Sequence, residues 1–149
     1  MRRRWHWCML LLGGALGLLS CAPRPEEPGD AQPYALLVLP DAIRLLALDT
    51  QSVDPRVRVS AIRVTPGTHR LRFAYAGAST QHVGQQNDPL CLETQAGHQY
   101  LFDTRTRGII WRPVIEADTL IPGYCTAHQC TEAEMRFPPQ PPRLAFCPQ

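Results

Sequence analysis

The sequence predicts an all-β fold: a small two-layer antiparallel β-sandwich of about six or seven strands. Three observations support this prediction. Short β-branched or aromatic runs are separated by Gly, Pro, Asn and Asp, these runs recur at short intervals, and no segment after residue 20 keeps the 3.6-residue apolar period of a helix. We expect the packed sandwich over residues 34–137, which is long enough for one domain.

Two apolar runs, Tyr34–Leu39 and Ile43–Leu48, are the first expected strands. Because neither run alternates apolar with polar residues, both faces of these strands could be buried, or the second run could form a short helical turn. Val57–Val64 does alternate, but its apolar phase shifts partway along the run. That shift predicts a bulge or bend near Ser60 and Ala61.

The clearest local pattern predicts a hairpin whose turn is Pro66-Gly67, a residue pair that suits a β-turn. Val57–Val64 would form its first strand. Successive side chains of a strand point to opposite faces, so the second strand has one apolar face and one basic face. The apolar face carries Leu71, Phe73 and Tyr75, and the basic face carries Arg70 and Arg72.

Gly77–Pro89 is expected to be a polar loop, after which the chain returns to strands. Leu90–Thr94 and Gln99–Asp103 flank a turn-like Gln-Ala-Gly-His segment, which predicts a second hairpin. Ile109–Ile115 is the last expected strand. Its Pro113 cannot donate a ladder hydrogen bond, which indicates an edge position or a bulge.

Two segments carry recognisable motifs: Val64–Phe73 has the sequence VTPGTHRLRF, and Ala96–Tyr100 has the sequence AGHQY. They resemble the V-x-P-G-x-H-x-L hairpin and the A-G-x-x-Y hairpin of the small periplasmic lipoprotein domains related to the PEGA type. A late strand with Trp111 follows, so the resemblance covers about Leu36–Val114. It implies a compact β-sandwich that serves as a binding or structural module, without assigned catalytic residues. The Pro-Glu-Gly-Ala tetrapeptide itself is absent.

Residues 1–20 are typical of a lipoprotein signal peptide. Arg2–Arg4 supply a positive start, and Cys8–Ser20 is an uncharged run that is too short for a comfortable transmembrane helix. Leu18–Cys21, with the sequence LLSC, resembles a lipobox. We therefore expect cleavage between Ser20 and Cys21 and attachment of a diacylglycerol to the Cys21 thiol. An ordinary secretory signal peptide and a permanent N-terminal anchor are the alternatives.

Residues 21–33 and 138–149 are proline-rich, and we expect a tether and a C-terminal tail there. A stiff, solvated tether would reach about 35 Å at roughly 3 Å per residue. Two or three acyl chains on Cys21 would hold the domain stably on a membrane. Ala22 stands where inner-membrane lipoproteins often have aspartate, which resembles the pattern of outer-membrane sorting, with the domain facing the periplasm of a Gram-negative cell.

Four cysteines remain after the lipobox: Cys91, Cys125, Cys130 and Cys147. An even number in an oxidising compartment predicts two disulfides, and four cysteines allow three pairings. We favour a bond from Cys147 to an earlier cysteine, because that bond would hold down the proline-rich tail. The alternative is a soft-metal site in which Cys125, His128 and Cys130 bind copper or zinc.

Histidines and carboxylates give weaker indications of chemistry. His69 and His98 lie next to turn glycines, where a ring is expected to be solvated or to bond the backbone, so a cysteine–histidine nucleophile is disfavoured. Four carboxylates are treated as surface charges: Glu93, Asp103, Glu116 and Asp118. We therefore expect neither an enzyme nor a cofactor.

Four arginines lie along the strands of the predicted first hairpin: Arg58, Arg63, Arg70 and Arg72. On one exposed sheet face they could bind an anionic envelope polymer or a lipid headgroup, and the alternative is an ordinary solvated face. Loss of Arg2–Arg4 with the signal peptide leaves basic and acidic residues nearly balanced, so no strong electrostatic partner follows. Because we expect the domain to be exported, we do not expect a nucleic-acid partner.

The sequence as a whole predicts a membrane-anchored bacterial envelope lipoprotein that acts as a non-enzymatic binding or structural module. Its membrane contact is the lipid anchor, and an envelope protein or anionic polymer is the expected partner. The alternative function is a periplasmic metal-binding or redox protein that uses Cys125, His128 and Cys130.

Overall fold

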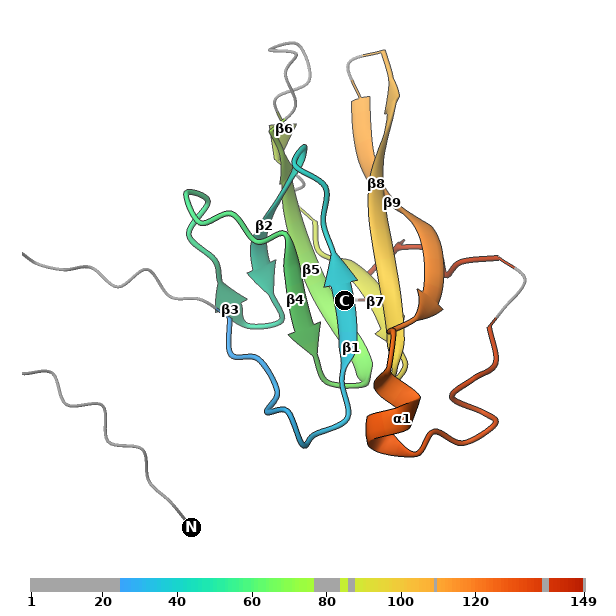
Figure 1. The fold of residues 1–149 in the computed structure, drawn as a ribbon. Coiled ribbons are helices and arrows are strands. Elements are labelled where there is room, and N and C mark those ends of the chain that lie inside the picture. Colours follow the sequence, from blue (N-terminus) through green and yellow to red (C-terminus); the bar gives the residue numbers. More distant parts are fainter. Residues whose placement is uncertain (1–24, 77–83, 86–87, 109, 138–139, 149) are drawn as a thin grey trace, which may run out of the picture.

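The computed structural model describes residues 25–76, 84–85, 88–108, 110–137 and 140–148 (Figure 1). Several predictions fall outside these residues. They concern the signal peptide, the lipobox with Ser20 and Cys21, the first residues of the tether, and most of the Gly77–Pro89 loop. Among the described residues, no helix is both long enough and apolar enough to span a bilayer.

The described residues form an all-β sandwich, as the sequence predicts. Two sheets pack face to face (Figure 1). Sheet A has the strand order β4-β1-β8-β9 and comprises β4 (Ala61–Val64), β1 (Ala35–Val38), β8 (His98–Arg107) and β9 (Ile110–Leu120). Sheet B has the order β10-β7-β5-β2-β3 and comprises β10 (Ala145–Phe146), β7 (Leu90–Thr94), β5 (Gly67–Tyr75), β2 (Ile43–Leu48) and β3 (Gln51–Ser52), with β6 (Gly84–Gln85) paired to β5.

Seven of these strands have four residues or more, which agrees with the predicted number, and β3, β6 and β10 have two each. One pairing departs from the expected antiparallel arrangement, because β1 lies parallel to β8, with Leu37 opposite Tyr100. A parallel pair needs a long crossover connection. The chain between β1 and β8 supplies this connection. It forms β2 and β3 in sheet B, β4 in sheet A, and then β5, β6 and β7 in sheet B before it enters β8.

Both predicted hairpins are wrong in the same way. β4 belongs to sheet A and β5 to sheet B, so Pro66-Gly67 joins the two layers rather than two neighbouring strands. The segment Gln95–Gly97 likewise carries the chain from β7 in sheet B to β8 in sheet A. Each of these strands has an apolar face, and the two faces meet across the core instead of lying side by side.

The predicted strand phase is confirmed in β5. Leu71 and Phe73 are fully buried, whereas Arg70 is exposed on the other face. The Phe73 ring packs against the Phe102 ring of sheet A at 5.5 Å between centroids, so the two layers share one core. Tyr75 is partly buried and stacks on Trp111.

β9 is the edge strand of sheet A, which agrees with the position that Pro113 indicates. The strand continues past the predicted end at Ile115 as far as Leu120. Its register with β8 shifts between Leu101 and Phe102, which leaves Glu116 as an extra residue on β9. The predicted bend near Ser60 corresponds to the loop that leads into β4, because the strand begins only at Ala61.

The packed unit extends past both expected domain boundaries. Pro25 is buried, and the backbone N–H of Glu26 donates to Gln51 Oε1 at 2.9 Å. At the other end, β10 lies in the predicted tail and pairs with β7. The packed segment therefore starts earlier and ends later than residues 34–137.

A single helical turn, α1 (Tyr124–His128), closes one end of the sandwich. Tyr124 is buried there with Ala96 and Ile121, and its ring lies against Gly97. Gly97 has a φ of +80°, and a Cβ at this position would lie 2.7 Å from the Tyr124 ring. Glycine is therefore required by both the backbone conformation and the close approach of the ring.

Candidate functional site

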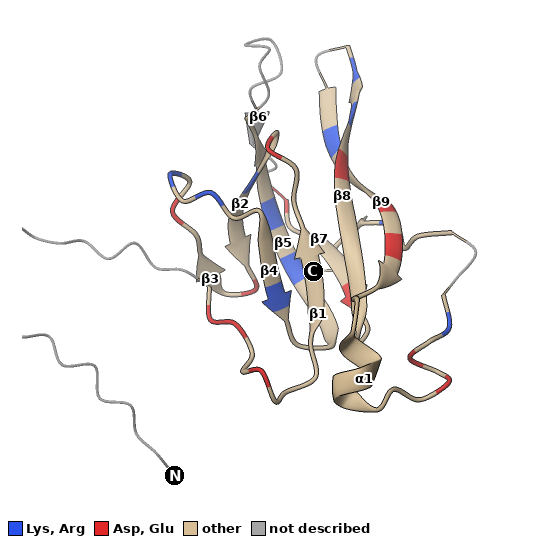
Figure 2. Cartoon of the chain, viewed as in Figure 1, with Lys and Arg blue, Asp and Glu red and all other residues tan. Residues whose placement is uncertain are grey.

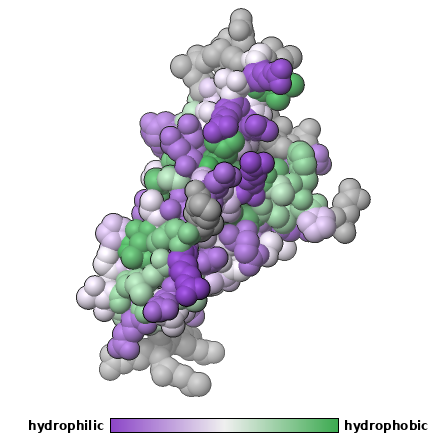
Figure 3. All heavy atoms as spheres, turned by 90° about the vertical axis from the view of Figure 1, so that its right-hand side faces the viewer, coloured by the Kyte–Doolittle hydropathy of each residue, from purple (hydrophilic) through white to green (hydrophobic). Residues whose placement is uncertain are grey.

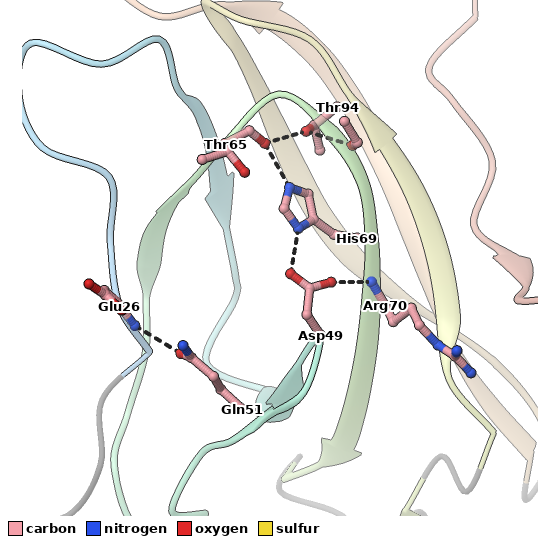
Figure 4. Close-up of polar contacts among 8 residues, drawn as sticks. Glu26, Asp49, Gln51, Thr65, His69, Arg70 and Thr94 are labelled. Carbon is pink, nitrogen blue, oxygen red and sulfur yellow. Dashed lines mark hydrogen bonds and ion pairs between the residues drawn. The ribbon is translucent and has the colours of Figure 1, made fainter.

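His69 is the centre of a polar cluster at the turn between β4 and β5 (Figure 4). Its Nδ1 lies 2.8 Å from Asp49 Oδ2, and its Nε2 lies 2.7 Å from the backbone oxygen of Thr65. The second Asp49 oxygen accepts a hydrogen bond from the backbone N–H of Arg70 at 2.9 Å. The hydroxyl of Thr94 donates to the same Thr65 oxygen. The cluster therefore joins the end of β2, the turn and β7.

The chemistry available to His69 follows from these partners. A backbone carbonyl is only an acceptor, so Nε2 must carry a proton and donate to Thr65. Nδ1 is occupied by the Asp49 carboxylate, so neither ring nitrogen is free to accept a proton from a substrate. His69 is also buried, which corrects the expectation of a solvated ring, although its bond to the backbone agrees with the prediction.

A cleft of about 260 Å³ lies beside this cluster, between the N-terminal segment and the ends of the strands. Glu26, Glu27 and Asp49 bring carboxylates to it, and the rest of the lining is Pro28, Gln32, Leu48, Gln51, Val64, Thr65 and His69. The backbone N–H of Arg63 donates to Glu27 Oε2 at 3.3 Å. These bonds fasten the segment before β1 to the sandwich.

His98 forms a second histidine–carboxylate pair, with Nδ1 2.8 Å from Asp118 Oδ1. The His98 side chain is 0% exposed and that of Asp118 5%. The His98 Nε2 lies 3.1 Å from the backbone oxygen of Glu134, so both nitrogens of this ring are also in contact with a polar partner. Burial raises the pKa of Asp118, and the hydrogen bond from His98 opposes that shift. Asp118 is therefore not the surface charge that the sequence suggested, and the His98 ring is not solvated.

Neither histidine–carboxylate pair was predicted, although part of each was visible in the sequence. His69 has the same strand parity as Leu71 and Phe73, and His98 has the same parity as Tyr100, so the strand phase alone predicts buried rings. Each aspartate lies 20 residues from its histidine, on another element. No local pattern connects such residues.

The four cysteines form two disulfides, Cys91–Cys147 and Cys125–Cys130. Cys147 bonds an earlier cysteine, as favoured, and the bond anchors the C-terminal segment to β7. The proposed soft-metal ligands Cys125 and Cys130 are bonded to each other, so neither sulfur is the thiolate that a metal requires. His128 stacks on the Tyr124 ring with centroids 4.2 Å apart. Within the described residues, no three His, Cys, Asp or Glu side chains are grouped to hold a metal ion.

The predicted arginine face is divided between the two sheets (Figure 2). Arg63 lies on β4 in sheet A, pairs with Asp30 and lies over the Tyr34 ring. Arg70 and Arg72 lie on β5 in sheet B. Arg58 lies in the loop before β4 and pairs with Asp41. The expectation of one basic face is wrong because it depended on the β4–β5 hairpin.

Comparison with known proteins identifies no relative: no family model matches the chain, and no curated protein or solved structure is significantly similar to it. The resemblance to PEGA-type domains stays a prediction.

Proposed function

We propose that this chain is an exported bacterial lipoprotein, cut between Ser20 and Cys21 and acylated on Cys21. Its sandwich then acts as a non-enzymatic binding or structural module on the periplasmic side of the outer membrane. The observation that carries the proposal is the position of the lipobox cysteine. Only Ala22, Pro23 and Arg24 separate Cys21 from Pro25, the first described residue, which is already buried in the sandwich.

The disulfides support export. Structural disulfides persist in oxidising compartments and are rare in the reducing cytosol. Cys91–Cys147 and Cys125–Cys130 together use all four cysteines of the domain. Cys21 is therefore the one cysteine after the signal peptide that is left for a lipid.

The early start of packing changes the expected distance from the membrane. Four residue steps from Cys21 to Pro25 reach about 14 Å at most when fully extended. This is well below the reach of about 35 Å expected for a tether that continues to Pro33. The proposed anchor would thus hold the side of the sandwich near β3 close to the bilayer.

A non-enzymatic role is supported by the two histidines. In both His69 and His98, one ring nitrogen contacts a carboxylate and the other a backbone carbonyl. Such rings stabilise the fold, and neither has a nitrogen left for general base catalysis. We propose an envelope protein or an anionic polymer as the partner.

Metabolic labelling tests the lipoprotein proposal. Cells expressing the chain are grown with a clickable fatty acid, and the wild type is compared with Cys21→Ser. We expect label on the wild type and none on Cys21→Ser. Cys8→Ser is the matched control, because this cysteine lies in the expected signal peptide, and its mature form should be labelled like the wild type. Equal labelling of the wild type and Cys21→Ser would refute the proposal.

A further inference from the structure

We propose that a cleft between the β8–β9 hairpin and the C-terminal segment binds a phosphate group through Arg105, Arg112 and Arg143. The cleft has a volume of about 420 Å³, which lies within the range of small-molecule sites. It is separate from the polar cluster around His69. The inference depends on the fold alone and not on the proposed lipid anchor.

Two of the three arginines form a like-charged pair. Arg105 on β8 lies directly opposite Arg112 on β9 in the antiparallel register. Side chains opposite each other lie on the same face, and like charges there destabilise the sheet. Both side chains are exposed. A bound anion between the two guanidinium groups would turn this repulsion into attraction.

Arg143 comes from the far end of the sequence and is held beside this pair. Leu144, its neighbour, packs against the main core. The next two residues form β10, which pairs with β7, and Cys147 is bonded to Cys91. These three attachments fix the backbone that presents the third guanidinium to the cleft.

The cleft has no acidic residue in its lining, whereas some arginines elsewhere have acidic partners. Arg58 pairs with Asp41 and Arg63 with Asp30. Among the residues that the structure describes, no carboxylate forms an ion pair with Arg105, Arg112 or Arg143. The nearest acid along β8, Asp103, lies two residues from Arg105 on the same exposed face, opposite Val114, but it does not line the cleft. The three positive charges therefore remain uncompensated within the lining.

The rest of the lining is mostly apolar and favours a ligand with an uncharged body. It consists of Pro113, Val114, Ile115, Gln140, Pro141, Pro142 and Leu144. Figure 3 shows the side of the molecule that lies on the right in Figure 1, where hydrophilic side chains in the upper half lie next to a hydrophobic area. Apolar residues beside the three guanidinium groups can contact the uncharged part of such a ligand.

Charge selects phosphate over carboxylate as the recognised group. A phosphate monoester carries a charge of about −1.5 to −2 at pH 7, which nearly balances the cross-strand arginine pair. A single carboxylate, with one negative charge, would neutralise only part of the positive charge of Arg105 and Arg112. Guanidinium groups also bind phosphate oxygens in bidentate pairs, so three of them can surround one phosphate.

Calorimetric titration tests the site. The full chain carrying Cys21→Ser is used, so that no acyl group contributes, and it is titrated with inorganic phosphate, glucose 6-phosphate, glucose and acetate. We expect both phosphates to bind and glucose to give no signal. Arg112→Gln should weaken phosphate binding about tenfold or more, the loss expected for one charge-assisted contact. The matched control is Arg56→Gln, an exposed arginine in the loop between β3 and β4, and it should bind like the parent chain.

A second arm identifies the source of the phosphate. The same chains are sedimented with phosphatidylcholine vesicles that contain or lack phosphatidic acid. Binding that needs phosphatidic acid and is lost in Arg112→Gln assigns the site to a lipid headgroup, and binding of glucose 6-phosphate alone assigns it to a soluble phosphate ester. The proposal is overturned if neither source binds, if acetate binds as tightly as phosphate, or if Arg112→Gln and Arg56→Gln behave alike.

A thermal measurement gives a second readout of phosphate binding, because a ligand that binds only the folded chain stabilises it. Arg112→Gln removes the like-charged pair, so its unfolding temperature without phosphate should equal or exceed that of the parent chain. Added phosphate should raise the unfolding temperature of the parent and of Arg56→Gln, but not that of Arg112→Gln. Equal phosphate shifts in all three chains would contradict a site at Arg112.

Discussion

His98 and Asp118 form a hydrogen-bonded pair that is almost completely removed from solvent, with Nδ1 and Oδ1 2.8 Å apart. The His98 ring also bonds the backbone oxygen of Glu134 and lies 4.6 Å from the Phe137 ring between centroids. The pair thus connects the edge strand β9 with β8 and with the segment that follows α1. It is a structural link across sheet A.

Removing one partner of this pair should be strongly destabilising. Asp118→Ala leaves the buried His98 Nδ1 without an acceptor, and we expect a loss of about 3 kcal/mol in the free energy of unfolding. Asp103→Ala, on the exposed face of β8, is the control and should change it by less than about 0.5 kcal/mol. Urea unfolding followed by circular dichroism measures both. A similar small effect for the two variants would show that the pair contributes little.

Phe73 and Arg72 test the strand phase of β5. The Phe73 ring is fully buried between the sheets, so Phe73→Ala should cost about 3–5 kcal/mol. Arg72 points to the outer face, and Arg72→Ala should cost less than about 1 kcal/mol. Urea unfolding of the two variants compares them directly. If Arg72→Ala proved the more damaging, the inner face of β5 would be misassigned.

Tyr100 should make the fold sensitive to alkaline pH. Burial raises its pKa to about 12, against a hydrogen bond from the Gln95 backbone that lowers it. Because the folded pKa is raised, the folded state keeps a proton that the unfolded chain releases. The stabilisation that this bound proton provides is complete below pH 10 and is lost as pH rises through 12. The free energy of unfolding then falls by about 3 kcal/mol in total.

Ultraviolet titration of tyrosinate follows this ionisation. The wild type should contain a tyrosine that ionises near pH 12, and Tyr100→Phe should lack that final step. The result would count against the burial of Tyr100 if the substitution instead removed a step near pH 10.

The two disulfides should contribute unequally to stability. Cys91–Cys147 spans 56 residues and Cys125–Cys130 only 5. Chain entropy then predicts losses of about 4 kcal/mol for Cys91→Ala with Cys147→Ala and about 2 kcal/mol for Cys125→Ala with Cys130→Ala. Unfolding in urea ranks the two double variants. The reverse order would mean that the Cys91–Cys147 bond, which closes the longer loop, contributes little to the free energy of unfolding.

The oxidised domain also tests the metal alternative. With both disulfides formed, thiol titration in denaturant should find no free thiol among these four cysteines. Two reactive thiols, together with bound copper or zinc that is lost in His128→Ala, would instead favour a metal site at Cys125, His128 and Cys130.

Strand composition and phase could be predicted from the sequence because they are local properties. The alternation in β5 identifies Leu71 and Phe73 as inner residues, and Pro113 indicates an edge strand. The need for a bond that holds Cys147 to the domain followed from the prolines around it. Each of these inferences depends on a few adjacent residues.

Sheet membership could not be predicted in the same way. A Pro66-Gly67 turn can join two paired strands of one sheet or two strands in different layers. β4 and β5 each have an apolar face in both arrangements. The choice is made by distant partners, β1 for β4 and β2 and β7 for β5. The arginine cleft depends on the same long-range order, since Arg143 reaches Arg105 and Arg112 only through the folded tail.

The identity of the mature N-terminus tests the central claim most directly. The chain is purified from cell membranes, digested, and its N-terminal peptide is analysed by mass spectrometry. The account predicts a peptide that begins at Cys21 and carries diacylglycerol on the thiol. A membrane-bound chain whose N-terminus lies before Cys21, or whose Cys21 is unmodified, would contradict it.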